Sequence, residues 1–170
     1  MSENRGKQFE VKIKEAFERV PNTVVIRLHD QVTRYVGSTN PCDFIVYRKP
    51  VMLAIECKSV HGNTLSIYSN PKPDKNGVLH GLYGNITDKQ WEGLLEMSKA
   101  AGVIAGIICW WVDKDVTRFL PIQSLKSFYD DGTKSVRYDF DCPEFVYLQG
   151  EKKRVFFDYD MSYFLKEVIK

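Results

Sequence analysis

The fold is decided by two short stretches, NPCDFIV at residues 40–46 and LAIECKS at residues 53–59. Apolar and β-branched side chains dominate both stretches, as is typical of strands. A polar turn with a proline, at residues 48–50, lies between them. Residues 43–47 and 51–58 are therefore predicted to form a β-hairpin.

Three charged side chains are expected to meet at the open end of this hairpin. Because side chains alternate along a strand, Glu56 and Lys58 share one face. Twelve residues separate Asp43 from Glu56. Since the start of one hairpin strand lies beside the end of its partner, the two carboxylates can converge.

Such a convergence suits a hard divalent cation. Two carboxylates, a backbone carbonyl and waters are typical ligands of Mg²⁺, and Mn²⁺ is a possible substitute. A metal held in this way polarises a phosphodiester and helps to ionise an attacking water. Lys58 can stabilise the developing charge.

A simpler interpretation stays open. A glutamate and a lysine two apart on a strand commonly form an exposed ion pair that contributes little to stability. The aspartate at hairpin distance favours the catalytic interpretation, although short patterns of this kind also occur in unrelated sequences. Cys57, His61 and His80 match no standard zinc spacing, and Cys57 is expected to be a buried thiol.

The remaining elements follow from periodicity and from helix-capping signals. Before the hairpin, we predict a helix with apolar positions from 9 to 20, a strand at 23–28 and a polar loop at 29–40. After it come a long irregular connection at 59–86, a helix capped by Thr87 with Gln90 in a capping box, a strand at 103–111 buried on both faces and a returning strand at 116–120. The chain then continues with a short helix at 122–129, a late hairpin of 145–148 with 154–157 around Gly150, and a last helix capped by Asp160. This order predicts an α/β domain, a mixed β-sheet flanked by helices, that spans residues 1–170.

Composition sets broad limits on function. The 170 residues are 44% hydrophobic and carry a formal net charge of +2, which permits nucleic-acid binding without requiring it. The four cysteines form no CxxC pair, and no apolar run approaches the length of a membrane span. No glycine-rich phosphate loop occurs. We expect a reduced, cytoplasmic protein that does not bind membranes and is not an NTPase.

Beyond these physical arguments, the segments PCDFIV and LAIECKS resemble the motif of the PD-(D/E)XK nucleases. The opening NRGKQFE resembles the start of RecU-type Holliday junction resolvases and, less closely, of the archaeal Hjc resolvases. The helix glutamine Gln90 and the segments FVYL and VFFDY near the carboxyl end also resemble RecU. The resemblance implies a restriction-endonuclease-like fold and a magnesium-dependent endodeoxyribonuclease.

The resemblance also implies a site and a substrate. The enzyme would resolve four-way DNA junctions in recombination and repair, as a homodimer, in a bacterial cell or a phage-infected host and associated with the nucleoid. Two alternatives stay open, a restriction-like or repair nuclease that acts on other DNA structures and a catalytically idle DNA-binding module. The implied residues are Glu10, Asp43, Glu56, Lys58 and Gln90 for catalysis, Asp43, Glu56, Cys57, Glu10 and Asp30 for the metal, and Arg5, Lys7, Arg34, Lys72 and Lys75 for DNA.

One departure from the RecU pattern is visible in the sequence. RecU proteins carry a long stalk between the first strand and the catalytic aspartate, whereas only fourteen residues separate Leu28 from Asp43 here. The insertion instead follows Lys58, at residues 59–86. We expect this connection to replace the stalk and to engage the open centre of a junction.

Overall fold

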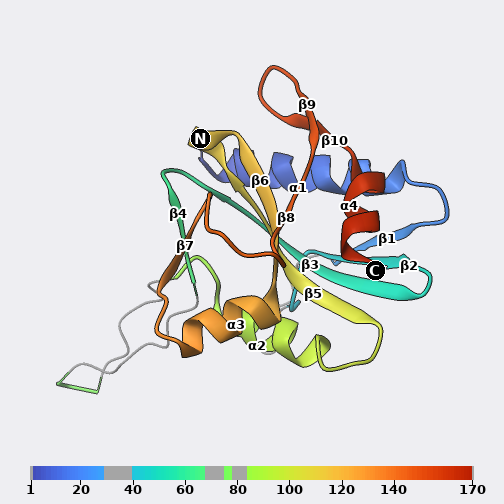
Figure 1. Ribbon diagram of the computed structural model, residues 1–170. Coiled ribbons are helices and arrows are strands. Elements are labelled where there is room, and N and C mark those ends of the chain that lie inside the picture. Colours follow the sequence, from blue (N-terminus) through green and yellow to red (C-terminus); the bar gives the residue numbers. More distant parts are fainter. Residues whose placement is uncertain (1, 29–39, 68–74, 78–83, 170) are drawn as a thin grey trace, which may run out of the picture.

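A six-stranded mixed sheet forms the centre of the molecule (Figure 1). The computed structural model describes residues 2–28, 40–67, 75–77 and 84–169. β3 and β5 pair in parallel and the other neighbours pair antiparallel. In sheet order, the strands are β1 (Val24–Arg27), β2 (Phe44–Arg48), β3 (Val51–Val60), β5 (Val103–Trp111), β6 (Val116–Pro121) and β8 (Val146–Tyr147).

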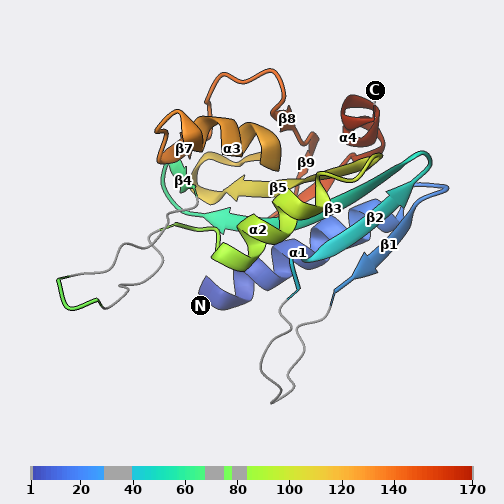
Figure 2. The ribbon, with the colours of Figure 1, turned by 90° about the horizontal axis from the view of Figure 1, so that it is seen from below.

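Helices cover both faces of this sheet (Figures 1 and 2). α1 (Ser2–Glu18) and α4 (Met161–Val168) lie on one face, and α2 (Asp88–Met97) and α3 (Ile122–Asp130) lie on the other. The predicted α/β class, a mixed sheet flanked by helices, is thus confirmed. Among the described segments, no helix has the length and apolar character needed to cross a membrane.

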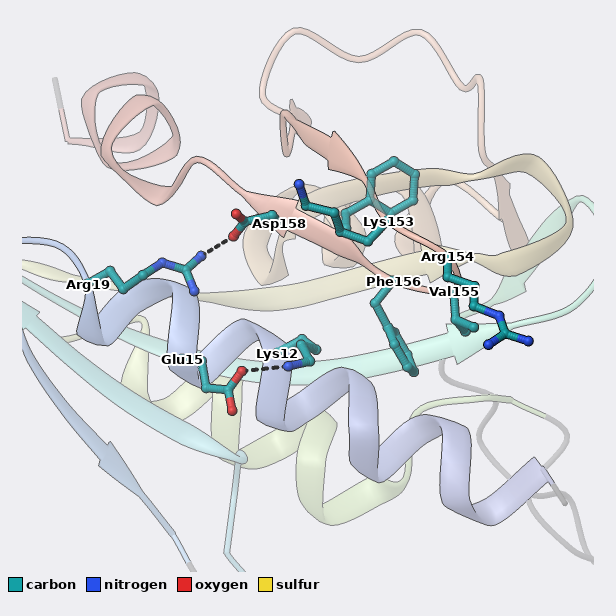
Figure 3. A pocket seen from close by; sticks show the side chains of 9 residues that line it. Lys12, Glu15, Arg19, Lys153, Arg154, Val155, Phe156 and Asp158 are labelled. Atoms are coloured by element: carbon teal, nitrogen blue, oxygen red, sulfur yellow. Dashed lines mark hydrogen bonds and ion pairs between the residues drawn. The ribbon is translucent and has the colours of Figure 1, made fainter.

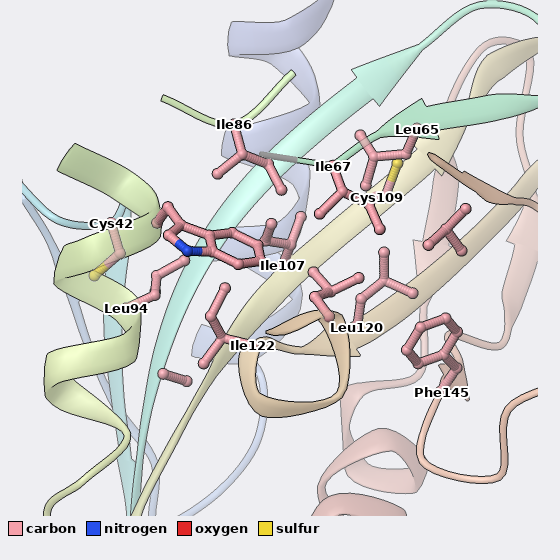
Figure 4. Close-up of a cluster of buried hydrophobic side chains, with 14 of the residues drawn as sticks. Cys42, Leu65, Ile67, Ile86, Leu94, Ile107, Cys109, Leu120, Ile122 and Phe145 are labelled. Carbon is pink, nitrogen blue, oxygen red and sulfur yellow. The ribbon is translucent and has the colours of Figure 1, made fainter. Parts of the chain in front are cut away.

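The core is divided into two layers by the sheet. Along β3, Leu53, Ile55 and Cys57 pack towards α1 and α4, whereas Ala54 and Val60 pack towards α2 and α3. Figure 4 shows part of the second layer, in which side chains of α2, β5, β6 and α3 meet. β5 contributes to both layers, which confirms the prediction that this strand is covered on both faces.

Two small sheets lie at the periphery and correct the sequence prediction. β4 (Thr64–Ser66) pairs with β7 (Ser135–Arg137), so the first part of the supposedly irregular connection contains a strand. β9 (Gly150–Lys152) pairs with β10 (Phe157–Tyr159). A short 3-10 helix, η1 (Val112–Lys114), links β5 to β6.

The predicted late hairpin is wrong in its pairing. Residues 145–148 do not pair with residues 154–157, because Val146 and Tyr147 pair with Phe119 and Arg118 at the edge of the main sheet. Gly150 begins a strand of the true hairpin and does not lie in its turn. A Cβ at this position would lie 2.6 Å from the carbonyl oxygen of Asp158, so the close approach of β10 requires a glycine here.

Candidate active site

The hairpin register places Asp43 opposite Glu56. Phe44 pairs with Ile55, and one further step along the two strands brings the two acids together. The backbone N–H of Asp43 still donates to the carbonyl of Ile55 at 3.0 Å. Two residues further along β3, the backbone N–H of Cys57 donates to Oδ2 of the Asp43 carboxylate at 2.7 Å. Asp43 is therefore fixed where β2 begins, while β3 continues beyond it to Val60.

Glu56, Lys58 and Gln90 form a closed triangle of polar contacts on the α2 side of β3. The Lys58 Nζ lies 3.0 Å from Glu56 Oε1 and donates to Gln90 Oε1 at 3.0 Å. Gln90 Nε2 donates to the same oxygen of Glu56 at 2.5 Å. Glu56 is only 4% exposed, so these contacts satisfy an acid that the core has nearly closed off from water.

The start of α2 orients the glutamine in this triangle. Thr87 caps the helix, and the backbone N–H of Gln90 donates to Thr87 Oγ1 at 3.3 Å. In return, the backbone N–H of Thr87 donates to Gln90 Oε1 at 3.0 Å, which confirms the predicted capping box. Since Oε1 accepts from two donors, the amide nitrogen is the end that faces Glu56.

α2 also packs directly on the segment that precedes Asp43. A Cβ added to Gly93 would lie 2.4 Å from the Cβ of Pro41, so the absence of a side chain at Gly93 permits this contact. α2 therefore contacts the chain just before β2 through Gly93 and contacts β3 through Gln90. This packing holds the amide of Gln90 against Glu56.

Burial and like charge dominate the electrostatics of the site. Burial, and after it the negative charge of Asp43, raises the pKa of Glu56 to about 8, although Lys58 partly opposes this shift. Two acids that disfavour each other's ionised form are the kind of donor set that a divalent cation stabilises. The electrostatics therefore fit a metal-binding role for the pair.

The donor set is small. Among the described residues, no group of three or more His, Cys, Asp or Glu side chains is arranged to hold a metal ion. Mg²⁺ is nevertheless commonly held by one or two carboxylates together with waters and substrate phosphates. The pair of Asp43 and Glu56 thus fits a magnesium site of this kind.

The other expected ligands are placed less directly. Glu10, on α1, accepts a hydrogen bond from Arg27 Nη2 at 2.7 Å, and its charge adds only a minor contribution to the raised pKa of Glu56. The thiol of Cys57 is buried in the α1 and α4 layer, and burial raises its pKa well above the usual value. Cys57 contacts the site through its backbone N–H. Asp30 lies outside the described residues.

The expected DNA-binding residues are scattered. Arg5 and Lys7 are exposed on the first turns of α1. This end of the helix lies close to β3, as the 3.6 Å between a Cβ added to Gly6 and Ser59 Oγ indicates. Lys75 is exposed as well. Arg34 and Lys72 lie outside the described residues, as do residues 68–74 and 78–83 of the connection expected to engage a junction.

Sequence reasoning missed two contributions to the site. The contact between Gly93 and Pro41 was not anticipated, and neither was the pairing of Arg27 with Glu10. Both depend on how α2 and α1 lie on the sheet, which no local pattern encodes.

No protein-family model and no curated protein matches this chain. The chain is similar to a resolvase of known structure. That protein is Hjc of the archaeal hyperthermophile Archaeoglobus fulgidus, a Holliday junction resolvase, which is 20% identical with a TM-score of 0.46. The match covers 69% of this chain and 78% of that chain. A similarity of this size assigns neither an activity nor a substrate to this chain.

Proposed function

We propose that this chain is a metal-dependent endonuclease that hydrolyses phosphodiester bonds in branched DNA, above all in four-way junctions. The observation that carries the proposal is the placement of Asp43 opposite Glu56, with Lys58 and Gln90 bonded to the buried acid. The choice of branched DNA rests on the resemblance of the NRGKQFE segment to the starts of the RecU and Hjc resolvases, and of Gln90 and the FVYL and VFFDY segments to RecU.

In this proposal Asp43 and Glu56 hold Mg²⁺, or Mn²⁺ in its place. When bound, the metal supplies Lewis-acid stabilisation of the scissile phosphate and lowers the pKa of a coordinated water. The hydrogen bond from the Cys57 N–H fixes the orientation of the Asp43 carboxylate. Gln90 fixes that of Glu56, so both acids are held in place before DNA arrives.

Lys58 is the residue best placed to act on the substrate. Its ammonium group has three donors, and two of its contacts are to Glu56 and Gln90. An ammonium held at this point can donate to a phosphoryl oxygen or to the attacking water as negative charge develops. Glu56 and Gln90 act as its positioning groups.

A four-way junction is resolved by two symmetric cuts. One copy of this chain offers one pair of acids at the hairpin end, so we expect two copies related by a two-fold axis to act together. Such an enzyme would serve recombination and repair. The same site on a chain that prefers another DNA structure would be a repair or restriction-like nuclease, so the substrate has to be tested.

The test is a cleavage panel. A synthetic four-way junction and a linear duplex with the same arm sequences are each incubated with the protein in Mg²⁺, Mn²⁺, Ca²⁺ or EDTA. We expect saturable cleavage of the junction in Mg²⁺ and Mn²⁺, with no product in EDTA. Binding without cleavage over the whole metal titration would contradict the nuclease proposal. Equal cleavage of the linear duplex would contradict the junction preference.

A further inference from the structure

A groove runs between α1 and the β9–β10 hairpin, on the side of α1 that faces away from the sheet (Figure 3). Its volume is about 400 Å³. A second hollow of about 330 Å³ shares Lys12 and Phe156 with it and extends it towards Lys7. Figure 3 shows Lys12 and Glu15 on the helix side and Phe156 reaching towards them from the hairpin.

The lining of this groove is strongly basic. The lining contains five cationic side chains and only two carboxylates, those of Glu15 and Asp158. The groove therefore carries a larger positive excess than the whole chain, whose formal net charge is +2. The five cations are Lys7, Lys12, Arg19, Lys153 and Arg154.

Most of this charge is available to a polyanion. Within the described part of the chain, Lys7 and Arg154 have no ion-pair partner, and both are exposed. Lys12 pairs with Glu15 at 2.8 Å and Lys153 with Glu151 at 2.7 Å, with all four side chains about half exposed or more. Exposed pairs of this kind contribute little, so a phosphate can replace either carboxylate at small cost.

The groove has the length of a short piece of duplex. Lys7 and Arg19 lie twelve residues apart on α1 and at its end, which corresponds to roughly 18 Å at the helical rise. One strand of duplex DNA carries about five phosphates over that distance. A row of cations of this length matches a backbone better than a single small anion.

The hairpin side of the groove is anchored to the core. The Phe156 ring lies 5.5 Å from the ring of the buried Trp110. The Lys153 N–H donates to the Phe156 carbonyl at 2.8 Å and closes the turn. Arg19 donates to Asp158 and ties the base of the hairpin to the end of α1. Lys153 and Arg154 are thus presented by a fixed turn, which limits the entropy lost on binding.

We propose that this groove is a second DNA-binding surface, which holds the phosphate backbone of one duplex arm of the substrate apart from the hydrolytic site. The inference rests on the proposed function and extends it. The groove lies beside α1, on the face of the sheet that α1 covers. Glu56, Lys58 and Gln90 lie on the opposite face, which α2 covers. Its residues therefore set affinity and do not touch the reacting phosphate.

The experiment compares two double variants that remove the same charge. K153Q/R154Q removes two cations from the groove, and K99Q/K126Q removes two exposed lysines from the α2 and α3 layer. Binding of a fluorescent four-way junction is measured in EDTA between about 50 and 200 mM salt. Thermal melts and circular dichroism establish that both variants are folded.

We expect K153Q/R154Q to bind roughly tenfold more weakly or worse. Its plot of log affinity against log salt should be shallower by about 0.9 for each phosphate that the variant no longer neutralises. K99Q/K126Q should bind and cleave as the wild type does. Equal affinity and salt slope in the two variants would overturn the proposed role of the groove in DNA binding, even if the wild type cleaves junctions. Weak binding by K153Q/R154Q alone, with no metal-dependent cleavage by the wild type, would support the groove and overturn the nuclease.

Discussion

At the scale of single residues, the acid Glu56 distinguishes the site from an ordinary surface pair. Lys58 and Glu56 do form an ion pair at 3.0 Å, as the simpler interpretation of the sequence expects. The Glu56 side chain is only 5% exposed, however, and Gln90 donates to the same oxygen. An isolated buried carboxylate is costly, so the contacts from Lys58 and Gln90 are needed to keep it in place.

The first prediction concerns Lys58. K58A should slow cleavage about 100-fold or more, because the group that stabilises the developing charge is lost. The control is K49A, which removes an exposed lysine from the β2–β3 turn and should leave the rate unchanged. Single-turnover cleavage and thermal melts are measured for both. If K58A lowers the melting temperature while the cleavage rate is preserved, Lys58 serves the fold alone.

The second prediction concerns the pH dependence of stability in metal-free buffer. Folding raises the pKa of Glu56 from 4.5 to about 8, so the folded chain binds this proton more tightly than the unfolded chain does. The corresponding stabilisation is complete below pH 4.5 and is lost as the pH rises through about 8. E56Q does not titrate at this position, so the melting temperature of the wild type should fall relative to that of E56Q as the pH rises from 4.5 to about 8.

Melting curves in EDTA measure this difference directly. For a chain of this size, each kcal/mol of free energy of unfolding corresponds to about 2–4 °C. Saturating Mg²⁺ should raise the melting temperature of the wild type more than that of E56Q, because the metal removes the repulsion between Asp43 and Glu56. A difference between the two proteins that is constant with pH would contradict the burial of an ionisable group at position 56.

At the scale of elements, α2 is the part that assembles the site. It reaches β3 through Gln90 and the chain before β2 through Gly93. A glycine inside a helix usually costs about 1 kcal/mol relative to alanine. Its presence at the contact with Pro41 is explained by the lack of room for a Cβ.

The third prediction tests this contact. G93A should lower both the melting temperature and the cleavage rate, because the added Cβ would lie 2.4 Å from Pro41 and push α2 away from the acids. G6A, which changes a glycine of α1, is the matched control. A Cβ at this position would lie 3.6 Å from Ser59 Oγ, which is an ordinary contact distance. Helix propensity alone would stabilise both variants. A stabilised, fully active G93A would show that α2 does not pack on Pro41 in this way.

The elements that could be predicted from sequence are those fixed by local signals. The β2–β3 hairpin followed from two apolar stretches and a turn, and the start of α2 from the pattern of Thr87 and Gln90. Residues 145–148 show why other pairings were missed. Their apolar pattern indicates a strand but does not identify the strand with which it pairs, which is β6 of the main sheet.

At the scale of the whole molecule, the candidate site and the basic groove lie on different layers. Hairpin register alone brought Asp43 and Glu56 together, so their meeting could be predicted from sequence. The ion pair of Glu10 with Arg27 and the groove between α1 and the late hairpin could not, because each joins segments that are distant in sequence. Only the packing of α1 and of the β9–β10 hairpin determines these contacts.

The fourth prediction concerns assembly. Two symmetric cuts require two active sites, so we expect a particle of twice the 19.7 kDa chain mass at the concentrations that resolve junctions. Size-exclusion chromatography with light scattering measures this mass with and without a junction. A single chain per junction, together with cuts in both opposing strands, would contradict the expected two-fold arrangement.

The most direct test of the central claim compares D43N and E56Q with the wild type on a synthetic four-way junction in Mg²⁺. Both variants should bind the junction at least as well as the wild type, because affinity comes mainly from phosphate contacts and a negative charge has been removed. Both should lose cleavage almost completely, because the loss of a metal ligand costs several kcal/mol of transition-state stabilisation. Cleavage above about a tenth of the wild-type rate in both variants, a deficit of only about 1.4 kcal/mol, would contradict a metal site built on Asp43 and Glu56.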